Sequence, residues 1–103
     1  MLRGKQKRYL RSQGHNLEPL VLIGKDGLND GVITSVRENL ERHELIKIKI
    51  QQNSDAVAAV VAEELAEMIN CEVAQILGHT ILLYKRSNNV KNRRHSVEVF
   101  KIG

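Results

Sequence analysis

The sequence predicts a two-layer α+β fold in which the elements follow the order αβαβαββ and the four strands form one mixed sheet. Short apolar runs alternate with stretches of helical periodicity, and a two-residue turn joins the last two strands. Both β-α-β crossovers should be right-handed, so the two helices within them should lie on the same face of the sheet. With 103 residues, 42% hydrophobic and 27% charged, the chain has the size and composition of one globular domain.

The first two elements are predicted as a polar helix over residues 5–13 and a strand over Leu20–Ile23. Tyr9 and Leu10 are the main apolar anchors of the helix, and Gly14 marks its end. The strand is apolar on both of its faces. We therefore expect both faces to be covered, with the first helix helping to cover them.

A helix from Asn29 to about His43 and an alternating strand over residues 45–50 come next. The Asn29 side chain is suited to capping the first turn of this helix. The inward stripe of the helix is Val32, Ile33, Val36 and Leu40. In the strand, isoleucine alternates with lysine, so three isoleucines should face the core while Lys47 and Lys49 lie on the other face.

A second amphipathic helix is predicted to begin at Ser54 or Asp55 and to end at about Ile69. Its inward residues are expected to be Val57, Val61, Leu65 and Met68. Three glutamates occupy the opposite, solvated face of the same helix.

The last two strands are predicted over residues 72–77 and 80–86. Gly78-His79 joins them as a two-residue hairpin with glycine in the first turn position. Residues 96–102 are predicted to form either a weak edge strand or an extended tail.

Charge is segregated along the chain, whose formal net charge is +4. Residues 1–25 carry a net charge of +5 and residues 85–103 carry another +5, whereas residues 26–84 carry −6. Two positive ends around an acidic middle favour a surface that binds a polyanion over basic termini that are merely solvated.

Several function classes find no support in the sequence. No apolar run approaches the length of about 18 residues that a membrane span needs. There is no nucleophile–base pair, metal-ligand cluster, Walker-type loop or cofactor motif, so we predict neither an enzyme nor a bound metal or cofactor. The single cysteine, Cys71, is predicted to be buried and is typical of a reducing compartment, and we expect a cytoplasmic protein. Three aromatic residues are too few for a sheet surface on which bases stack.

The tetrad Gly24-Lys25-Asp26-Gly27 lies between the first strand and the helix that Asn29 begins. Glycine permits positive φ and a close approach of another backbone. A helix start adds unpaired N–H groups and the positive end of the helix dipole. With Lys25 at its tip, the loop is predicted to contact a nucleic-acid backbone. Two glycines at this spacing are common by chance, so the flanking strand and helix carry this prediction.

Five blocks of the sequence resemble the YhbY-type CRM (chloroplast RNA splicing and ribosome maturation) domain. The first three are Leu2-x-x-Lys5-Gln6-x-x-Tyr9-Leu10-Arg11, His15-x-x-x-Pro19 and Ile23-Gly24-Lys25-x-Gly27-Leu28. The other two are His43-Glu44-Leu45-Ile46-Lys47-Ile48-Lys49 and Gln75-x-x-Gly78-x-Thr80-Ile81-x-Leu83-Tyr84-Lys85. The resemblance implies an RNA-binding protein that associates with precursors of the large ribosomal subunit. It also implies a fold similar to the C-terminal domain of translation initiation factor three.

This resemblance makes residues 1–86 a CRM-like RNA-binding domain and residues 87–103 a basic C-terminal tail. The candidate RNA-binding residues are Lys5, Lys7, Arg8, Arg11, Gly24, Lys25, Gly27, Lys47 and Lys49. The expected partners are rRNA and large-subunit precursors, with no membrane and no small-molecule substrate, and the chain should act as a monomer. The alternative is a DNA-binding architectural protein of similar size and charge, which a preference for structured RNA over duplex DNA would exclude.

Overall fold

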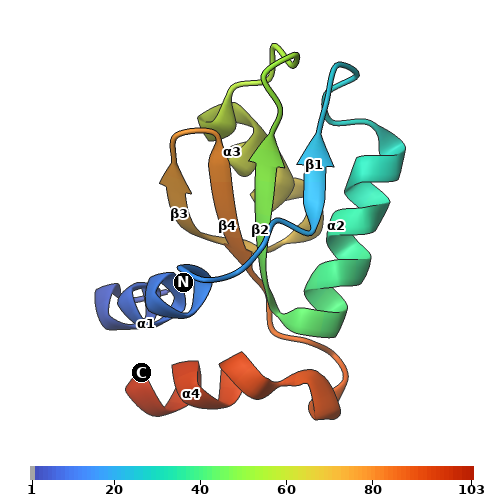
Figure 1. The fold of residues 1–103 in the computed structure, drawn as a ribbon. Helices are drawn as coiled ribbons and strands as arrows, with labels where there is room; N and C mark the ends of the chain where they lie inside the picture. The colour runs from blue at the N-terminus through green and yellow to red at the C-terminus, as the bar shows by residue number, and fades with distance from the viewer. Residues whose placement is uncertain (1) are drawn as a thin grey trace.

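The predicted mixed sheet of four strands is present in the computed structural model, which describes residues 2–103. The helices are α1 (Gly4–Gly14), α2 (Asp30–His43), α3 (Ala58–Ile69) and α4 (Arg94–Ile102), with a short 3-10 helix, η1 (Val90–Asn92), before α4. The strands are β1 (Val21–Ile23), β2 (Leu45–Ile50), β3 (Glu72–Leu77) and β4 (Thr80–Tyr84). Their order is β1-β2-β4-β3; β1 is parallel to β2, and β4 is antiparallel to both of its neighbours (Figure 1). The predicted fold class is therefore confirmed.

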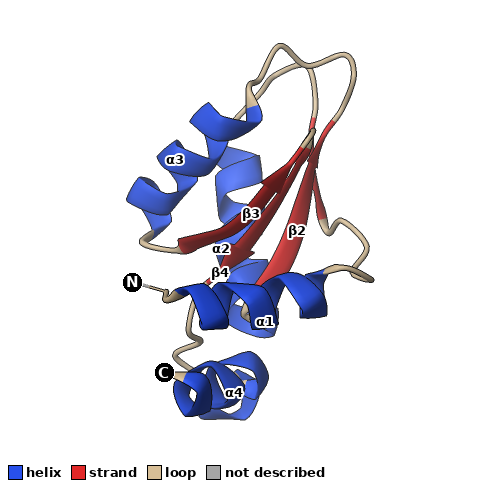
Figure 2. Ribbon diagram, turned by 90° about the vertical axis from the view of Figure 1, so that its left-hand side faces the viewer, coloured by secondary structure: helices blue, strands red, loops and turns tan. Residues whose placement is uncertain are grey.

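The face of the sheet that α2 and α3 cover holds the larger apolar core (Figure 2). The three isoleucines of β2 are buried there, as their alternation predicts, together with Val36 and Leu40 of α2. The Asn29 side chain accepts a hydrogen bond from the Val32 N–H at 2.9 Å, so the predicted cap of α2 is confirmed. Both crossover helices thus lie on one face of the sheet.

The other face is only half covered, because α1 crosses it at one end of the sheet (Figure 2). Leu10 of α1 is fully buried against this face, and Gly14 lies so close to Leu82 of β4 that an added Cβ would be 2.6 Å from a Leu82 methyl carbon. The prediction that both faces of the first strand are covered is wrong, since Leu20 and Leu22 are 49% and 52% exposed. The reason is that α1 packs over β2, β4 and β3, whereas β1 is an edge strand.

Helix α3 begins later than predicted and is rotated slightly about its axis. The Ser54 hydroxyl accepts a hydrogen bond from the Ala56 N–H in a local turn, and the helix begins only at Ala58. Val57 and Met68, predicted to face inward, are 60% and 42% exposed. The buried residues are Val61, Ala62, Leu65 and Ile69. The small side chain of Ala62 is 1% exposed, so this flank of the helix is the one that lies against the sheet.

The C-terminal segment is a helix, so the prediction of an edge strand or extended tail over residues 96–102 is wrong. Strand β4 lies between β2 and β3, and the chain that leaves it at Tyr84 is therefore not beside a free edge. It emerges next to α1, and α4 packs against that helix: the Gln6 side chain donates to the Val99 carbonyl at 3.0 Å. The division of the chain into a domain at 1–86 and a tail at 87–103 stays a prediction.

The two ends of the sheet differ in what surrounds them. The loop end, where β1 and β2 finish, carries the loops over residues 24–29 and 51–57 and the turn at residues 78–79 (Figure 1). The helical end, where β2 begins and β4 finishes, carries α1, η1 and α4. No helix among residues 2–103 is long and apolar enough to cross a bilayer.

Candidate nucleic-acid interface

The glycine loop, Gly24 to Gly27, is a tight turn at the loop end. The Gly27 N–H donates to the Gly24 carbonyl at 3.0 Å, and the Asn29 N–H donates back to the Gly27 carbonyl at 3.1 Å. Gly27 has a φ of +64°, a conformation that side-chain-bearing residues adopt only with strain. The strand end, the turn and the cap of α2 therefore follow one another within seven residues, which fixes the shape of the loop.

The two central residues of the glycine loop present unpaired backbone donors. Lys25 and Asp26 are exposed, and no acceptor within residues 2–103 is hydrogen-bonded to either of their N–H groups. The neighbouring loop is held against this one, since the Gln51 N–H donates to the Ile23 carbonyl at 2.8 Å. A Cβ added at Gly24 would be 3.0 Å from the Gln51 side-chain oxygen, so glycine keeps this surface open.

The predicted basic residues of α1 are not brought to the glycine loop. Lys5, Arg8 and Arg11 are exposed and Lys7 is partly buried, but α1 lies at the helical end of the sheet (Figures 1 and 2). The predicted site residues therefore form two groups, one at each end.

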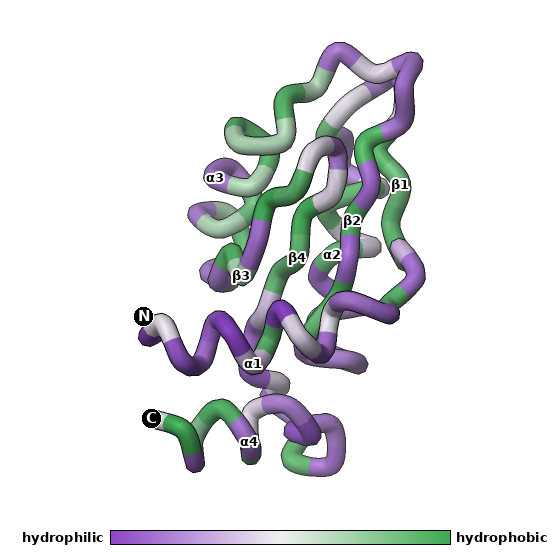
Figure 3. Tube along the Cα trace, turned by 60° about the vertical axis from the view of Figure 1, so that its left-hand side comes forward, coloured by the Kyte–Doolittle hydropathy of each residue, from purple (hydrophilic) through white to green (hydrophobic). Residues whose placement is uncertain are grey.

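Lys47 and Lys49 lie between these two groups, on the half-covered face of the sheet. Lys49 pairs with Leu22 of β1 and with Thr80 of β4, and Thr80 pairs with Leu77 of β3. These four residues form one row across the sheet on the uncovered half of that face. Figure 3 shows the alternation of polar and apolar residues along β2.

The sheet offers no stacking surface for bases. Its single aromatic residue, Tyr84, is 7% exposed and hydrogen-bonds to Ser96 of α4. Phe100 is exposed, but it lies on α4 and not on the sheet. Contacts through backbone and charge therefore remain the mode of recognition that this surface supports.

A groove of about 520 Å³ at the helical end was not predicted from the sequence. It lies between the end of α1, the start of β1 and β2, the end of α2 and the segment from η1 to α4. Its basic lining residues are Arg42, His43, Lys47, Lys91, Arg94 and His95. Glu18 is the one acidic side chain in the lining. We call this the basic groove.

Two carboxylates hold the C-terminal segment beside the basic groove. Glu44 is fully buried, and its carboxylate accepts hydrogen bonds from the N–H groups of Ser87, His95 and Ser96 at 2.7, 3.0 and 2.9 Å, and from the Ser96 hydroxyl. The last two N–H groups belong to the first turn of α4, so Glu44 caps that helix from a distant position.

Glu41, one helical turn before Glu44, binds the same segment. Its carboxylate accepts hydrogen bonds from the Ser87 hydroxyl at 2.8 Å and from the N–H groups of Asn88 and Asn89 at 2.6 and 3.1 Å. The hydrogen bond from the Ser87 hydroxyl is the main cause that lowers the pKa of Glu41; desolvation opposes it, and the two N–H groups and nearby Lys85 lower the pKa further. Neither carboxylate is thus directed at a cation of the basic groove.

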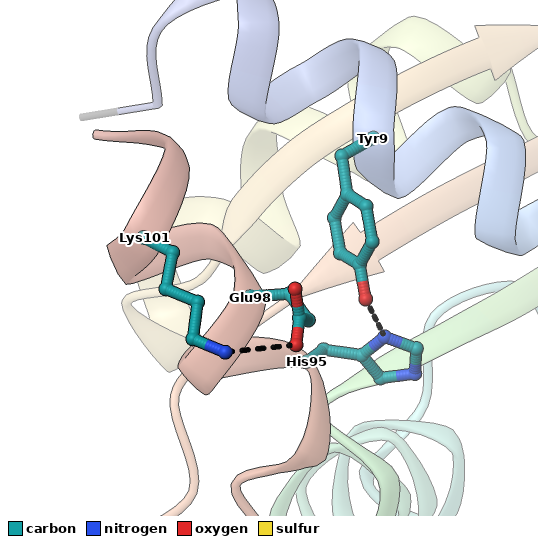
Figure 4. A network of polar contacts seen from close by, with 4 residues as sticks. All are labelled: Tyr9, His95, Glu98 and Lys101. Atoms are coloured by element: carbon teal, nitrogen blue, oxygen red, sulfur yellow. Dashed lines mark hydrogen bonds and ion pairs between the residues drawn. The ribbon is translucent and has the colours of Figure 1, made fainter.

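Contacts between α1 and α4 complete the helical end (Figure 4). The Tyr9 hydroxyl lies 3.5 Å from Nδ1 of His95, while Lys101 pairs with Glu98 at 3.6 Å on the far part of α4. Burial lowers the pKa of His95, and neighbouring Arg94 lowers it further, whereas Glu44 acts in the opposite direction. Among residues 2–103, no group of three or more His, Cys, Asp or Glu side chains is placed to hold a metal ion.

Comparison with known proteins places these features in a family. The chain is 45% identical over 91 residues to a Bacillus subtilis protein named "Probable RNA-binding protein YqeI", covering 88% of this chain and 95% of that one. It is 31% identical over 87 residues to a Haemophilus influenzae protein named "RNA-binding protein", covering 84% and 88% of the two chains.

A solved structure agrees with these sequences. The solution structure of a hypothetical protein from Staphylococcus aureus matches with a TM-score of 0.75 and 41% identity, covering 91% of this chain and 98% of that one. The model of the CRS1 / YhbY (CRM) domain family matches residues 2–85. Because the family model spans most of the chain and these relatives match over most of their length, the chain belongs to the CRS1 / YhbY (CRM) domain family.

Proposed function

We propose that this protein binds RNA and acts, without catalysis and as a monomer, in assembly of the large ribosomal subunit in the cytoplasm. The observation that carries the proposal is the glycine loop, in which the exposed residues Lys25 and Asp26 have unpaired N–H groups shortly before the start of α2. Such donors, together with the positive end of a helix, bind phosphate oxygens. The names of the Bacillus and Haemophilus relatives support RNA as the polyanion.

The proposed contact runs through the RNA backbone. Gly24, Lys25 and Gly27 would bind one phosphate group, while Lys5, Lys7, Arg8 and Arg11 of α1 would bind others. Lys47 and Lys49 lie between the two groups and would bind phosphates of the RNA segment that joins them. If five or six of these cations contact phosphates, the slope of log affinity against log salt concentration should be about −4 for single-stranded RNA.

The test of the glycine loop compares two lysine variants. Lys25→Ala should weaken binding to structured RNA by about 1 kcal/mol and flatten the salt dependence by about one phosphate contact. Lys101→Ala removes the same charge from an exposed position at the opposite end of the molecule and is the matched control. Equal effects of the two variants would contradict a specific role of the loop.

Gly24→Val tests the same loop by blocking the approach of a phosphate sterically. The added Cβ meets only the end of the flexible Gln51 side chain, so the fold should be retained. The added side chain should reduce the access of a phosphate to the loop. The free energy of RNA binding should therefore fall by more than the free energy of unfolding. Unchanged RNA affinity in this folded variant would exclude the phosphate contact. If the unmodified protein binds duplex DNA as tightly as structured RNA, the DNA-binding alternative is favoured.

The cellular role is tested by sedimentation. Tagged protein should cosediment with large-subunit precursors in an RNase-sensitive manner, and its removal should cause these precursors to accumulate, most strongly in the cold. Equal occupancy of small subunits, large subunits and polysomes would contradict a role in assembly.

A further inference from the structure

The basic groove is separated from the glycine loop by the length of β2. It lies at the start of that strand, whereas the glycine loop lies beyond its last residue, Ile50. Six residues of strand extend over about 17–20 Å. The two surfaces therefore cannot contact the same phosphate group, and the groove needs a ligand of its own or a ligand long enough to reach both.

The groove cations are not paired with carboxylates in the part of the chain that the structure describes. Among residues 2–103, none of Arg42, Lys47, Lys91 and Arg94 forms an ion pair with a carboxylate. Glu41 of α2 and Glu44, which lies between α2 and β2, are engaged with N–H and hydroxyl groups of the C-terminal segment. The groove thus holds several positive charges with Glu18 as its one acidic lining residue, while the carboxylates of Glu41 and Glu44 bind the C-terminal segment instead.

The groove exists only because α4 is folded and docked. Lys91 belongs to η1 and Arg94 is the first residue of α4, and both lie beyond residues 2–85, which the family model matches. The hydrogen bonds from Ser87, His95 and Ser96 to Glu44 fix the segment that carries these two cations. Their position is therefore set by buried contacts, although the side chains themselves are exposed.

We propose that the basic groove is a second binding site for the RNA backbone, which takes phosphates of the same strand that the glycine loop contacts. Lys47 lines the groove, and Lys49 follows it on the same face of β2, about 7 Å further toward the loop end. The two lysines thus form a path of positive charge along β2 from the groove toward the glycine loop. The guanidinium groups of Arg42 and Arg94 can bind phosphate oxygens in a bidentate manner.

This inference rests on the proposed function, because it takes RNA as the ligand of the glycine loop. A path from the loop over Lys49 and Lys47 to the groove favours an extended polyanion with regularly spaced charges. An acidic peptide is the other class of ligand that such a groove could take, and the test below separates the two.

The test compares two double variants of the full chain with the same loss of charge. Lys91→Ala with Arg94→Ala removes two groove cations, and Arg86→Ala with Lys101→Ala removes two exposed cations outside the groove. The groove variant should bind a long, mixed-sequence single-stranded RNA about tenfold more weakly, with a salt slope smaller by about 1.4. The control pair should change both quantities much less. Thermal unfolding of both variants establishes that α4 remains docked.

The outcomes separate this inference from the proposed function. If the unmodified protein binds RNA and Lys25→Ala weakens that binding, the proposed function stands whatever the groove variant does. Equal affinities of the groove variant and the control pair would then overturn the second site alone. Binding of poly-glutamate that leaves the RNA bound to the unmodified protein, and that the groove variant loses, would assign the groove to an acidic peptide and also overturn the second site.

Discussion

The loop end and the helical end of the sheet both offer positive charge, but they are built in different ways. The glycine loop is closed by bonds between residues two or three positions apart, such as Gly27 to Gly24. The basic groove is assembled from α1, α2, β2 and the segment from η1 to α4, and Glu44 positions the cations of that last segment by binding residues 43 to 52 positions away. One end therefore depends on local backbone conformation and the other on long-range buried contacts, and the two should fail separately.

Removal of the Glu44 carboxylate should have the largest effect. Glu44→Ala leaves three N–H groups at the helical end without their acceptor, two of them in buried residues, and should lower the free energy of unfolding by about 3 kcal/mol. Urea denaturation measures this change, and Glu44→Gln should cost less because it retains one acceptor oxygen. Glu38→Ala on the exposed side of α2 is the control, expected within about 0.5 kcal/mol of the unmodified protein. A Glu44→Ala variant as stable as that control would contradict the role of Glu44.

A methyl group added at Gly14 should have the next largest effect. Its Cβ would be 2.6 Å from a methyl carbon of Leu82, which is 2% exposed and has little room to move. Gly14→Ala should therefore lower the free energy of unfolding by about 1–3 kcal/mol. Gly4→Ala in the same helix meets nothing within 4 Å and should be neutral or stabilising. Equal stability of the two variants would show that α1 is not held tightly against β4.

The helical end should also lose stability on mild acidification. Because the pKa of His95 is lowered in the folded protein, its contribution is present above the unfolded value of about 6.5 and is lost as pH falls below it. The groups that face His95 are Tyr9, Arg94 and Glu44. Unfolding measured between pH 8 and pH 5.5 should show a fall in stability that His95→Gln reduces. His79→Gln, an exposed histidine at the loop end, should leave the fall unchanged.

The smallest expected effect is on the thiol of Cys71, which reports on the core that both ends share. Burial raises the pKa of Cys71 to about 11, so alkylation of the native protein at neutral pH should be slow. The Cys71 thiol donates to the Leu65 carbonyl and lies on the α3 side of the sheet. Glu44→Ala should leave the alkylation rate nearly unchanged if only the helical end loosens. A large increase would show that the two ends unfold together.

The sequence predicted the parts of the fold whose signals are local. Alternation of isoleucine and lysine defined β2, the side chain of Asn29 defined the start of α2, and Gly78 defined the hairpin, whose glycine has a φ of +58°. The same holds for the glycine loop, which lies within a few residues of a strand end and a helix cap. Its role in RNA binding stays a prediction.

The sequence did not predict the features that depend on distant residues. Residues 94–102 form a helix and not an edge strand, because Glu44 caps the first turn and α1 covers Val99. The exposure of Leu22 depends on where α1 crosses the sheet, which its own sequence does not specify. Only the docking of α4 brings Arg42 and His43 to one groove with Arg94. The net charge of +5 over residues 85–103 was the one signal in the sequence that pointed toward this site.

The contact between α1 and α4 has a consequence for the order of folding during synthesis. Gln6 and Val99, which are hydrogen-bonded to each other, are 93 positions apart in the chain. A nascent chain emerges from its N-terminus, and contacts between distant residues form late. The side of α1 that contacts α4 should therefore stay uncovered until residues 94–102 have been made. The glycine loop needs only the first half of the chain. We therefore expect a newly made molecule to form its loop end first and the contact of α4 with α1 later.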